Sequence, residues 1–600
     1  MHASLRLNNI SRLPEPTQTL ATSAANGSTD DLKKLLNLIP DSPHADLRLF
    51  LPAFYANLDV DDIPDLRRQL NTDSGELSTH ISCAVLAVKG LAELQEHLVS
   101  RACSEVWSTI WTWIQFLEEC EQRRPSESRN QQLIITTILS LRRDPETALT
   151  IKNTPGVRAV FTKGWVAAVD DPNTPRELMI ELCKFVVEDM NAQDPRNSQE
   201  LIEGAGGVDG LAALIVKHIR RAIPQTDYTL DPHDGLALLA AYEILQKGPL
   251  AHSLANHGIV KAVSTALCAL CGPEMVMTEQ MIPLSVGTIM THIAEFPGYP
   301  WVQEGLDSGL LRGVVLCASR RMPLIDLALY ALFRETLPRA LVYHSTLSSL
   351  RAAIDDAQPF TNTEAFRRST LFDEWNTFVA LAEERLAVME KFDRGEIGQT
   401  RACDHLECGA IRTDDTLLRC GACRSAFYCS QACQAADWSA GHRKACRTYL
   451  KRENEECTHL SFRDHTFLRA LVHHDYDAAR AEVLVRQAGF LRAHPAPGAL
   501  GVVAFDYRRG RPQIEVGPAA AAADPAERGA RAVRSGGRVE IHVVLVSEGG
   551  QRSRGHFVPF RSSDGRVQER VAAIAASEGM VTAEVVENDG VLALEVARTH

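Results

Sequence analysis

The stretch CDHLECGAIRTDDTLLRCGACRSAFYCSQACQAADWSAGHRKAC, residues 403–446, decides how the rest of the chain is interpreted. It holds seven of the 15 cysteines of a 600-residue chain, and one histidine stands close to the last of them. The candidate metal ligands are Cys403, Cys408, Cys420, Cys423, Cys429, Cys433, His442 and Cys446. A stretch with so many thiols has little apolar material for a core, so we expect it to fold around metal ions.

The spacing of these residues suits metal coordination. Gly421 permits the tight turn that brings Cys420 and Cys423 to one ion. Cys433 follows Cys429 by one helical turn, and the histidine and the last cysteine repeat that spacing. Eight ligands divide into two tetrahedral sites, the geometry of structural zinc. Thiolates and imidazole exclude magnesium and calcium, so the sequence predicts two Zn²⁺ ions.

This stretch resembles the MYND family of zinc fingers. It has the family's order of ligands, with Tyr428 before a cysteine and Asp437-Trp438 before the histidine. The resemblance implies cross-braced pairing. One zinc would be held by Cys403, Cys408, Cys429 and Cys433, and the other by Cys420, Cys423, His442 and Cys446. The first cysteine pair is separated by four residues, where two are commoner in the family, and this makes His405 an alternative ligand.

The resemblance also implies a function, because the family binds short proline-containing peptides on partner proteins. Such a peptide would lie along the first strand of the finger, with Gln434 bonding its backbone and Trp438 offering an apolar wall to a proline ring. Trp438 is equally suited to a core position between the two zinc lobes. Gly421 stands where some members place a hydroxyl contact. We therefore expect an adaptor or regulator with protein partners.

An enzyme is the main alternative to such an interaction protein. Some MYND fingers are embedded in lysine methyltransferases of the SET type, but the motifs of that domain are not found after residue 446. A zinc ion with four protein ligands has no open position for water or substrate. We therefore expect no enzymatic activity, and residues 451–600 are the region where an activity is still conceivable. A nuclear transcriptional co-regulator is the other alternative.

Charge argues against nucleic acid as a partner. The formal net charge is −13, and seven thiolates with two Zn²⁺ ions add three negative charges, which gives −16. Around the finger, a side-chain excess of two positive charges is cancelled by the metal sites. The sequence has no apolar run of the ~18 residues that would span a membrane. Clustered thiols indicate a reducing compartment, so we expect an intracellular protein of the cytoplasm or nucleus.

The sequence before the finger predicts a mainly helical protein. Residues 1–45 read as a disordered tail, and residues 46–345 as a helical domain. A glycine followed by an aliphatic residue recurs at 51-residue intervals, at Gly156-Val157, Gly207-Val208, Gly258-Ile259 and Gly309-Leu310. This pattern weakly resembles armadillo-like repeats and favours an irregular helical solenoid over a non-repetitive helical domain. Residues 346–400 are expected to form connecting helices, with an apolar stripe over 366–392.

The sequence after the finger predicts a separate α+β domain over residues 451–600, following the MYND finger at 401–450. A helix is expected over 460–490, followed by strands. The expected strands are 500–507, 513–516, 538–546 and 556–560, with a hairpin over 581–596 that turns at Asn588-Asp589-Gly590. Residues 517–537 read as a flexible loop, whose arginines Arg528, Arg531, Arg534 and Arg538 are expected in solvent.

Overall fold

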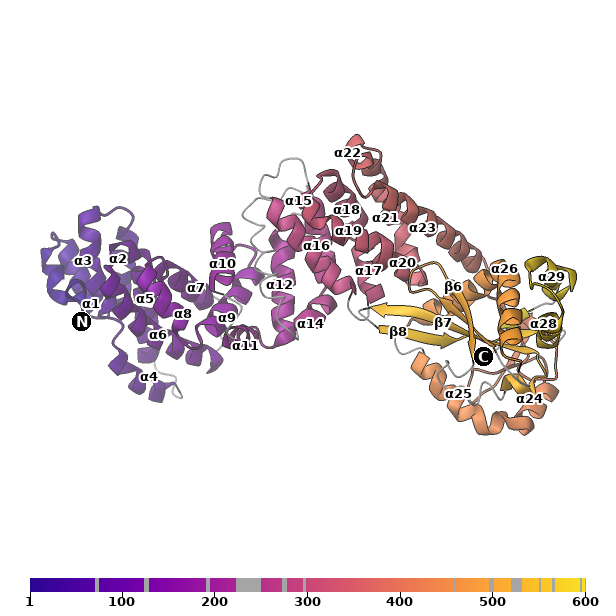
Figure 1. Ribbon diagram of the computed structural model, residues 1–600. Coiled ribbons are helices and arrows are strands. Elements are labelled where there is room, and N and C mark those ends of the chain that lie inside the picture. Colours follow the sequence, from indigo (N-terminus) through magenta and orange to yellow (C-terminus); the bar gives the residue numbers. More distant parts are fainter. Residues whose placement is uncertain are drawn as a thin grey trace. The chain divides into compact units, whose positions relative to one another are not determined.

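The chain is multidomain and mainly α-helical, as predicted, and its contacts divide it into two units (Figure 1). Unit 1 comprises Met1–Gln225 and Leu230–His257, and unit 2 comprises Thr226–Thr229 and Gly258–His600. The computed structural model describes residues 1–70, 75–123, 129–189, 195–222, 250–271, 278–294, 298–456, 460–495, 501–518, 531–549, 552–563, 567–593 and 596–598.

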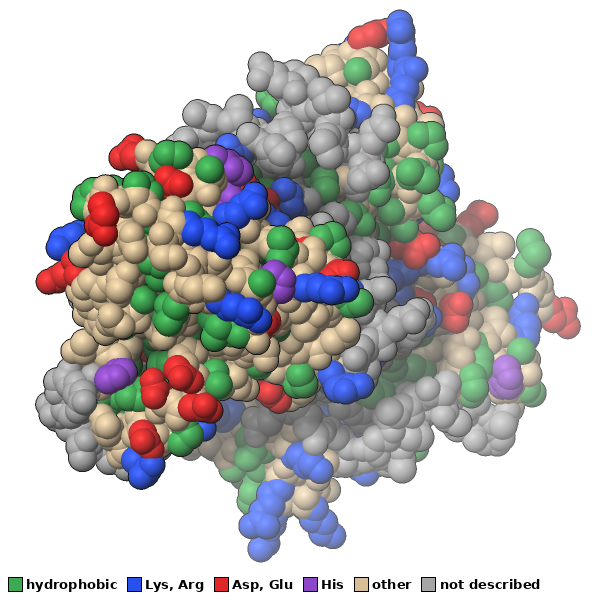
Figure 2. Space-filling model, turned by 90° about the vertical axis from the view of Figure 1, so that its left-hand side faces the viewer, with side chains coloured by type: hydrophobic (Ala, Val, Ile, Leu, Met, Phe, Trp, Pro, Cys, Tyr) green, Lys and Arg blue, Asp and Glu red, His purple; other side chains and the backbone are tan. Residues whose placement is uncertain are grey.

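Unit 1 is built from helices throughout its described residues. Its elements are η1 (Ala3–Leu5), η2 (Leu7–Arg12), α1 (Thr17–Ala25), α2 (Thr29–Leu38), α3 (His44–Tyr55), η3 (Val60–Asp62), α4 (Ile63–Gln69), α5 (Gly75–Glu93), η4 (Gln95–His97), α6 (Ser100–Arg123), α7 (Arg129–Leu141), α8 (Pro145–Asn153), α9 (Val157–Asp170), α10 (Arg176–Asp189), α11 (Pro195–Gly204), α12 (Val208–Ala222) and α14 (Leu250–Asn256). Acidic and basic side chains are interspersed over the face of this unit shown in Figure 2. That distribution is typical of a solvated surface.

The N-terminal 45 residues are ordered helices, and this replaces the predicted disordered tail. Ser28 caps α2 by accepting from the Asp31 amide, and Leu32 and Leu35 are fully buried on the inner face of this helix. α1 and α2 pack together, and α2 also packs on α5. The composition of short polar and small residues suggested disorder, but a capping serine followed by leucines at helical spacing is enough to form and bury a helix here.

The four recurring glycines have one structural role. Each stands immediately before a helix, at the starts of α9, α12, α15 (Ile259–Leu270) and α18 (Leu310–Ser319). Their φ angles are 82°, 123°, 84° and 83°, in the left-handed region that favours glycine. The aliphatic residue that follows is buried in three of the four, as at Ile259. The 51-residue spacing therefore corresponds to a repeated local conformation, two copies of which lie in each unit.

The helical part of unit 2 precedes the finger. Its further elements are α16 (Thr278–Ala294), α17 (Gly298–Leu306), α19 (Pro323–Ala331), the π-helix η5 (Leu332–Thr336), α20 (Leu337–Ala340), α21 (His344–Thr361), α22 (Glu364–Arg367) and α23 (Phe372–Asp393). The helix predicted over 366–392 corresponds to α23. Its stripe residues Trp375, Phe378 and Leu386 are buried.

The finger and the C-terminal region contain the strands of unit 2. The elements are β1 (Thr400–Ala402), β2 (Ile411–Thr413), η6 (Asp414–Thr416), β3 (Leu418–Arg419), β4 (Phe427–Tyr428), α24 (Gln431–Asp437), the π-helix η7 (Trp438–His442), α25 (Arg443–Glu456), α26 (Phe462–Ala493), β5 (Gly501–Asp506), β6 (Gln513–Pro518), β7 (Val539–Gly549), β8 (Arg552–Phe557), β9 (Phe560–Ser562), α28 (Val567–Ala576), α29 (Ala583–Asn588), η9 (Val591–Ala593) and β10 (Val596–Arg598). Three predicted strands correspond to β5, β6 and β7, whereas the strand predicted over 556–560 spans the end of β8, two residues outside any strand and the start of β9.

One sheet joins the finger to the C-terminal region, although two separate domains were predicted. Its strand order is β2-β1-β10-β9-β7-β5-β6, and β8 also pairs with β7. β1 of the finger lies parallel to β10, with Arg401 opposite Arg598. α26 packs on β5 and β6 and contacts α28 and α29 (Figure 1). The finger is therefore an extension of the C-terminal fold.

The predicted hairpin over 581–596 is wrong. Residues 583–588 form α29, which Thr582 caps by accepting from the Val585 amide, and of the residues described after α29 only 596–598 form a strand. The alternating valines suggested strands, but Val586 and Val591 are buried among helices α26 and α28. Burial against helices overrode the β-propensity of valine here.

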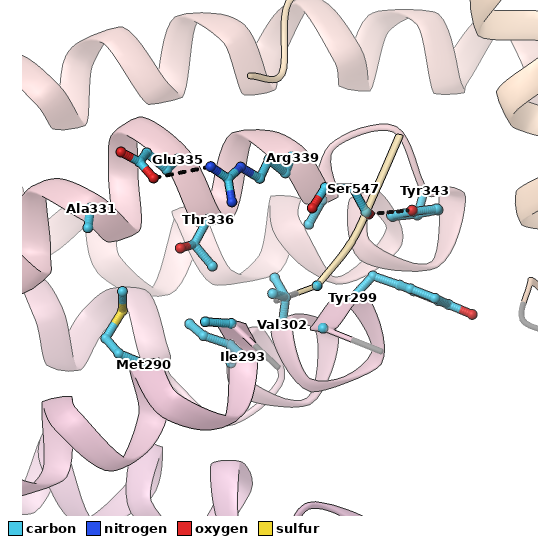
Figure 3. Close-up of a pocket in the computed structure, with 14 residues that line it drawn as sticks. Met290, Ile293, Tyr299, Val302, Ala331, Glu335, Thr336, Arg339, Tyr343 and Ser547 are labelled. Atoms are coloured by element: carbon cyan, nitrogen blue, oxygen red, sulfur yellow. Dashed lines mark hydrogen bonds and ion pairs between the residues drawn. The ribbon is translucent and has the colours of Figure 1, made fainter. Parts of the chain in front are cut away.

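A pocket of about 330 Å³ marks the junction between the helices of unit 2 and the sheet (Figure 3). Tyr343 closes one end, where its hydroxyl donates to the Ser547 carbonyl oxygen of β7 at 3.0 Å. Glu335 and Arg339 line the other end and pair with each other at 3.1 Å. Because its two charges pair internally, we assign this pocket a packing role. Within the described residues, no helix combines the length and apolar character needed to cross a bilayer.

Candidate metal centre

The structure gathers the eight predicted ligands into two clusters. Cys403, Cys408, Cys429 and Cys433 form site one, and Cys420, Cys423, His442 and Cys446 form site two. The ligand atoms within each cluster lie within 4.8 Å of one another. These are the cross-braced sets that the resemblance implied. His405 stands outside the set of site one, so the longer spacing of the first pair needs no substitute ligand.

The distances between ligand atoms fit zinc. Tetrahedral coordination at ~2.3 Å per sulfur places neighbouring sulfurs ~3.8 Å apart. In site one, the Cys429 sulfur lies 3.5 Å from those of Cys408 and Cys433. In site two, the Cys420 and Cys446 sulfurs are 3.9 Å apart, and Nε2 of His442 is 3.4 Å from the Cys420 sulfur. Each site therefore has four ligands converging on one Zn²⁺ ion.

Short elements of secondary structure position these ligands. The β3–β4 hairpin carries site-two ligands near its turn, and the Cys420 amide donates to the Ala426 carbonyl at 2.9 Å. Ser430 caps α24 by accepting from the Cys433 amide, which fixes the helical turn from Cys429 to Cys433. The π-helix η7 then brings His442 back to the hairpin.

Backbone donors and the histidine favour ionisation of one thiol in site two. Burial opposes the thiolate of Cys420, but the Cys423 amide and His442 donate to it and lower its pKa to about 6. Burial raises the pKa of Cys423 to about 12. A bound cation reverses that penalty, because a coordinating thiol is deprotonated by the metal.

A buried arginine from the C-terminal sheet binds the segment 403–408, here called the first knuckle, which carries the site-one ligands Cys403 and Cys408. The Arg561 guanidinium on β9 donates to four backbone carbonyls of one short segment, those of Cys403, His405, Leu406 and Cys408. The Arg561 residue is 1% exposed. A site of four thiolates and one Zn²⁺ carries two negative charges, and a buried cation offsets them. The clamp thus gives the long first knuckle its conformation.

Arg531 and Arg538 support the same segment, so they do not lie in a solvated loop as expected. Arg531 pairs with the buried Asp404 carboxylate at 2.6 Å, and Asp404 raises the pKa of Arg531 although burial opposes the charge. The other Asp404 oxygen accepts from the Phe427 amide at 2.7 Å. Arg538 donates to the Leu406 carbonyl. Arg528 lies outside the described residues.

Trp438, one of the two predicted peptide contacts, lies at the surface beside site two, and Gln434 directly follows the site-one ligand Cys433. Trp438 is 40% exposed, with its ring 5.7 Å from that of His442, and Gln434 is half-buried one helical turn earlier. Leu418 of β3 is 41% exposed and was not predicted. The only feature of the sequence that pointed to Leu418 was its position two residues before the ligand Cys420.

The geometry agrees with comparisons to known proteins. Residues 403–446 match the MYND finger family. Over 63 residues the chain is 36% identical to ubiquitin carboxyl-terminal hydrolase 19 of Arabidopsis thaliana, covering 10% of this chain and 9% of that protein. Over 150 residues it is 30% identical to ubiquitin carboxyl-terminal hydrolase 17 of the same plant, covering 24% and 18%. The chain thus spans less than a fifth of the length of these relatives. No solved structure matches the chain.

Proposed function

We propose that this chain is a non-catalytic interaction protein, whose zinc finger binds an extended segment of a partner protein along the outer edge of β3. The observation that carries the proposal is an open strand edge beside two exposed apolar side chains. β3 pairs only with β4 among the described strands, and Leu418 and Trp438 are 41% and 40% exposed. Strand addition to such an edge is a common mode of peptide recognition.

The hydrogen bonds of the hairpin show which backbone groups face this edge. Cys420 donates to Ala426, so these residues form a hydrogen-bonded pair. Antiparallel pairs alternate, and therefore the amide and carbonyl of Arg419 point away from β4. Phe427, opposite Arg419, supports this assignment because its own amide and carbonyl bond to Asp404 on the far side of β4. Arg419 thus offers one donor and one acceptor to an added strand.

The apolar side chains line one face of that edge. Leu418 lies opposite Tyr428, so both side chains are on the same face of the hairpin. The Tyr428 ring lies 6.2 Å from His442, which in turn lies 5.7 Å from Trp438. Leu418 and Trp438, here called the apolar wall, are therefore two exposed side chains connected through the buried rings of Tyr428 and His442. Proline rings of a bound peptide would pack on this wall.

The metal sites support a non-catalytic role, because both have four protein ligands and no open position. The similarity to two ubiquitin carboxyl-terminal hydrolases is confined to 9% and 18% of their lengths, so we do not carry their reaction over to this chain. We also propose that the protein works in a reducing compartment, the cytoplasm or nucleus, because its zinc ligands must remain thiolates.

Affinity capture with three full-length variants tests the binding edge. Leu418→Ser and Trp438→Ala remove the two ends of the wall, and Leu450→Ala is the matched control, since Leu450 on α25 is 39% exposed. We expect both wall variants to lose the same partners, identified by quantitative mass spectrometry, while the control keeps them. Identical capture by all three variants would refute the proposal.

A further inference from the structure

The second face of β3 differs from the apolar wall and is strongly basic. Arg419 lies on this face, opposite Phe427, and borders a pocket of about 310 Å³ between the finger and the start of α26. Of the lining residues that the structure describes, four are arginines and one, Asp414, is a carboxylate. The arginines are Arg401 of β1, Arg419 of β3, Arg424 directly after Cys423, and Arg469 of α26.

Two of these arginines are held close together in spite of their like charges. Arg469 is 7% exposed and lines the same pocket as Arg401. Arg401 also lies over the Phe427 ring at 4.1 Å and pairs with Asp414 at 2.9 Å. Among the described lining residues, one carboxylate stands beside four guanidinium groups, which leaves a positive potential in a concave, partly desolvated place. Such a place favours an anion.

The backbone is strained at the same place. Arg424 has a φ of 58°, a left-handed conformation that is unfavourable for a residue with a side chain. Its carbonyl accepts from Nε of Arg419, which fixes the direction of the Arg419 guanidinium along the pocket. The Arg419 guanidinium also lies 5.4 Å from the centre of the Phe427 ring. Strain of this kind concentrates at binding sites, where the conformation serves the ligand.

A strand added to β3 would present its side chains alternately to the two faces. The residue opposite Arg419, here called the central residue, would exchange both backbone hydrogen bonds with Arg419 and point its side chain to the basic pocket. Its two neighbours would point toward Leu418 and Trp438. Their amides would face solvent, so these positions tolerate proline, whereas the central position needs an N–H group.

We infer that the finger selects partner segments in which an acidic residue stands between two apolar or proline residues, of the form Pro-Glu-Pro. This inference rests on the proposed binding edge and adds the charge of the ligand to it. The overall charge of the finger argues against binding nucleic acid. The structure separates the charges, because arginines far apart in the sequence meet on one face of β3.

Fluorescence anisotropy with the full-length protein and labelled short peptides tests the inference. Three peptides share prolines that fix the register and differ only in the central residue, which is Glu, Gln or Lys. We expect the Glu peptide to bind about tenfold more tightly than the Gln peptide, and the Lys peptide more weakly still, because the pocket offers charge-assisted hydrogen bonds. Arg419→Gln should abolish the preference for Glu over Gln. Arg412→Gln, an exposed arginine of β2 that does not line the pocket, should preserve it.

The outcomes separate this inference from the proposed function. Equal binding of all three peptides, still lost in Trp438→Ala, would refute acidic selection and leave the binding edge standing. Tighter binding of the Lys peptide would also refute acidic selection. A peptide with an N-methylated central Glu lacks the amide that Arg419 requires, so undiminished binding of that peptide would refute the edge itself. No binding of any peptide would refute both.

Discussion

Arg561→Met is the substitution that tests most sharply how the finger is integrated into the C-terminal sheet. Methionine keeps an unbranched side chain but removes the guanidinium that donates to four carbonyls of the segment 403–408. Breaking a buried charged network typically destabilises a protein by 3–5 kcal/mol, so we expect a loss of about 4 kcal/mol. For a unit of this size, that corresponds to a fall in Tm of roughly 6 °C.

The same substitution should weaken zinc binding at site one. The knuckle loses its conformation, and the anionic site loses a buried cation, so we expect a 10- to 100-fold loss of affinity there. Zinc release to a chromophoric chelator, followed together with thermal unfolding of the full-length protein, measures both effects. The expected result is one zinc equivalent released early and one released at the wild-type rate.

Arg570→Met is the matched control, because Arg570 on α28 is half-exposed and pairs with Asp589 only at 3.6 Å. A surface substitution of this kind should change stability by less than ~0.5 kcal/mol. The reasoning fails if Arg561→Met is as stable as this control and keeps both zinc ions with wild-type release kinetics. That result would mean that the finger folds without support from the sheet.

Three further predictions concern site two, unit 1 and the repeated glycines. After dialysis against a weak chelator, Cys423→Ser should hold about one zinc equivalent less than the wild type, and circular dichroism should show the helices of unit 1 unchanged. A variant that keeps two equivalents would contradict the ligand set. Burial lowers the pKa of His218 in the folded protein to about 4. Since the unfolded chain then binds a proton more readily than the folded one, acid favours unfolding. The free energy of unfolding of unit 1 should be complete above pH 6.5 and fall by about 2 kcal/mol between pH 7 and pH 5. His218→Gln, which can still accept from Trp165, should remove that dependence in urea unfolding curves. Gly309→Ala should destabilise unit 2 by ~1–2 kcal/mol, because φ is 83° and the new Cβ would lie 3.1 Å from the Cys268 sulfur. As the control in the same calorimetric scan, Gly287→Ala places its Cβ in open space within α16 and should cause no loss of stability.

Residues close together in sequence made the metal centre predictable. The pairs Cys420–Cys423 and Cys429–Cys433 each lie within one turn of backbone, so their spacing alone indicates shared coordination. The glycine before each of four helices was also recognisable in the sequence, because the left-handed conformation at a helix start depends on that one residue. α23 and α26 were likewise found from the periodicity of their own side chains.

Long-range contacts were not predictable from local patterns. Arg561 meets the knuckle more than 150 residues away in sequence, and the chain between them gives no sign of the contact. Arg531 stands in a stretch whose composition is typical of a solvated loop, yet it pairs with the buried Asp404. β10 is three residues long and becomes a strand only because β1 and β9 lie on either side of it. Tertiary pairing, and not propensity, decides such elements.

The amide of Arg419 gives the most direct test of the proposed binding edge. In the full-length protein labelled with ¹⁵N-arginine and ¹⁵N-leucine, this amide faces the open side of β3 and should exchange quickly with solvent, whereas the Leu418 amide faces β4 and should be protected. Saturating Pro-Glu-Pro peptide should slow exchange at Arg419 by at least about tenfold and leave Leu418 unchanged. A bound peptide that leaves exchange at Arg419 unaltered would contradict the account.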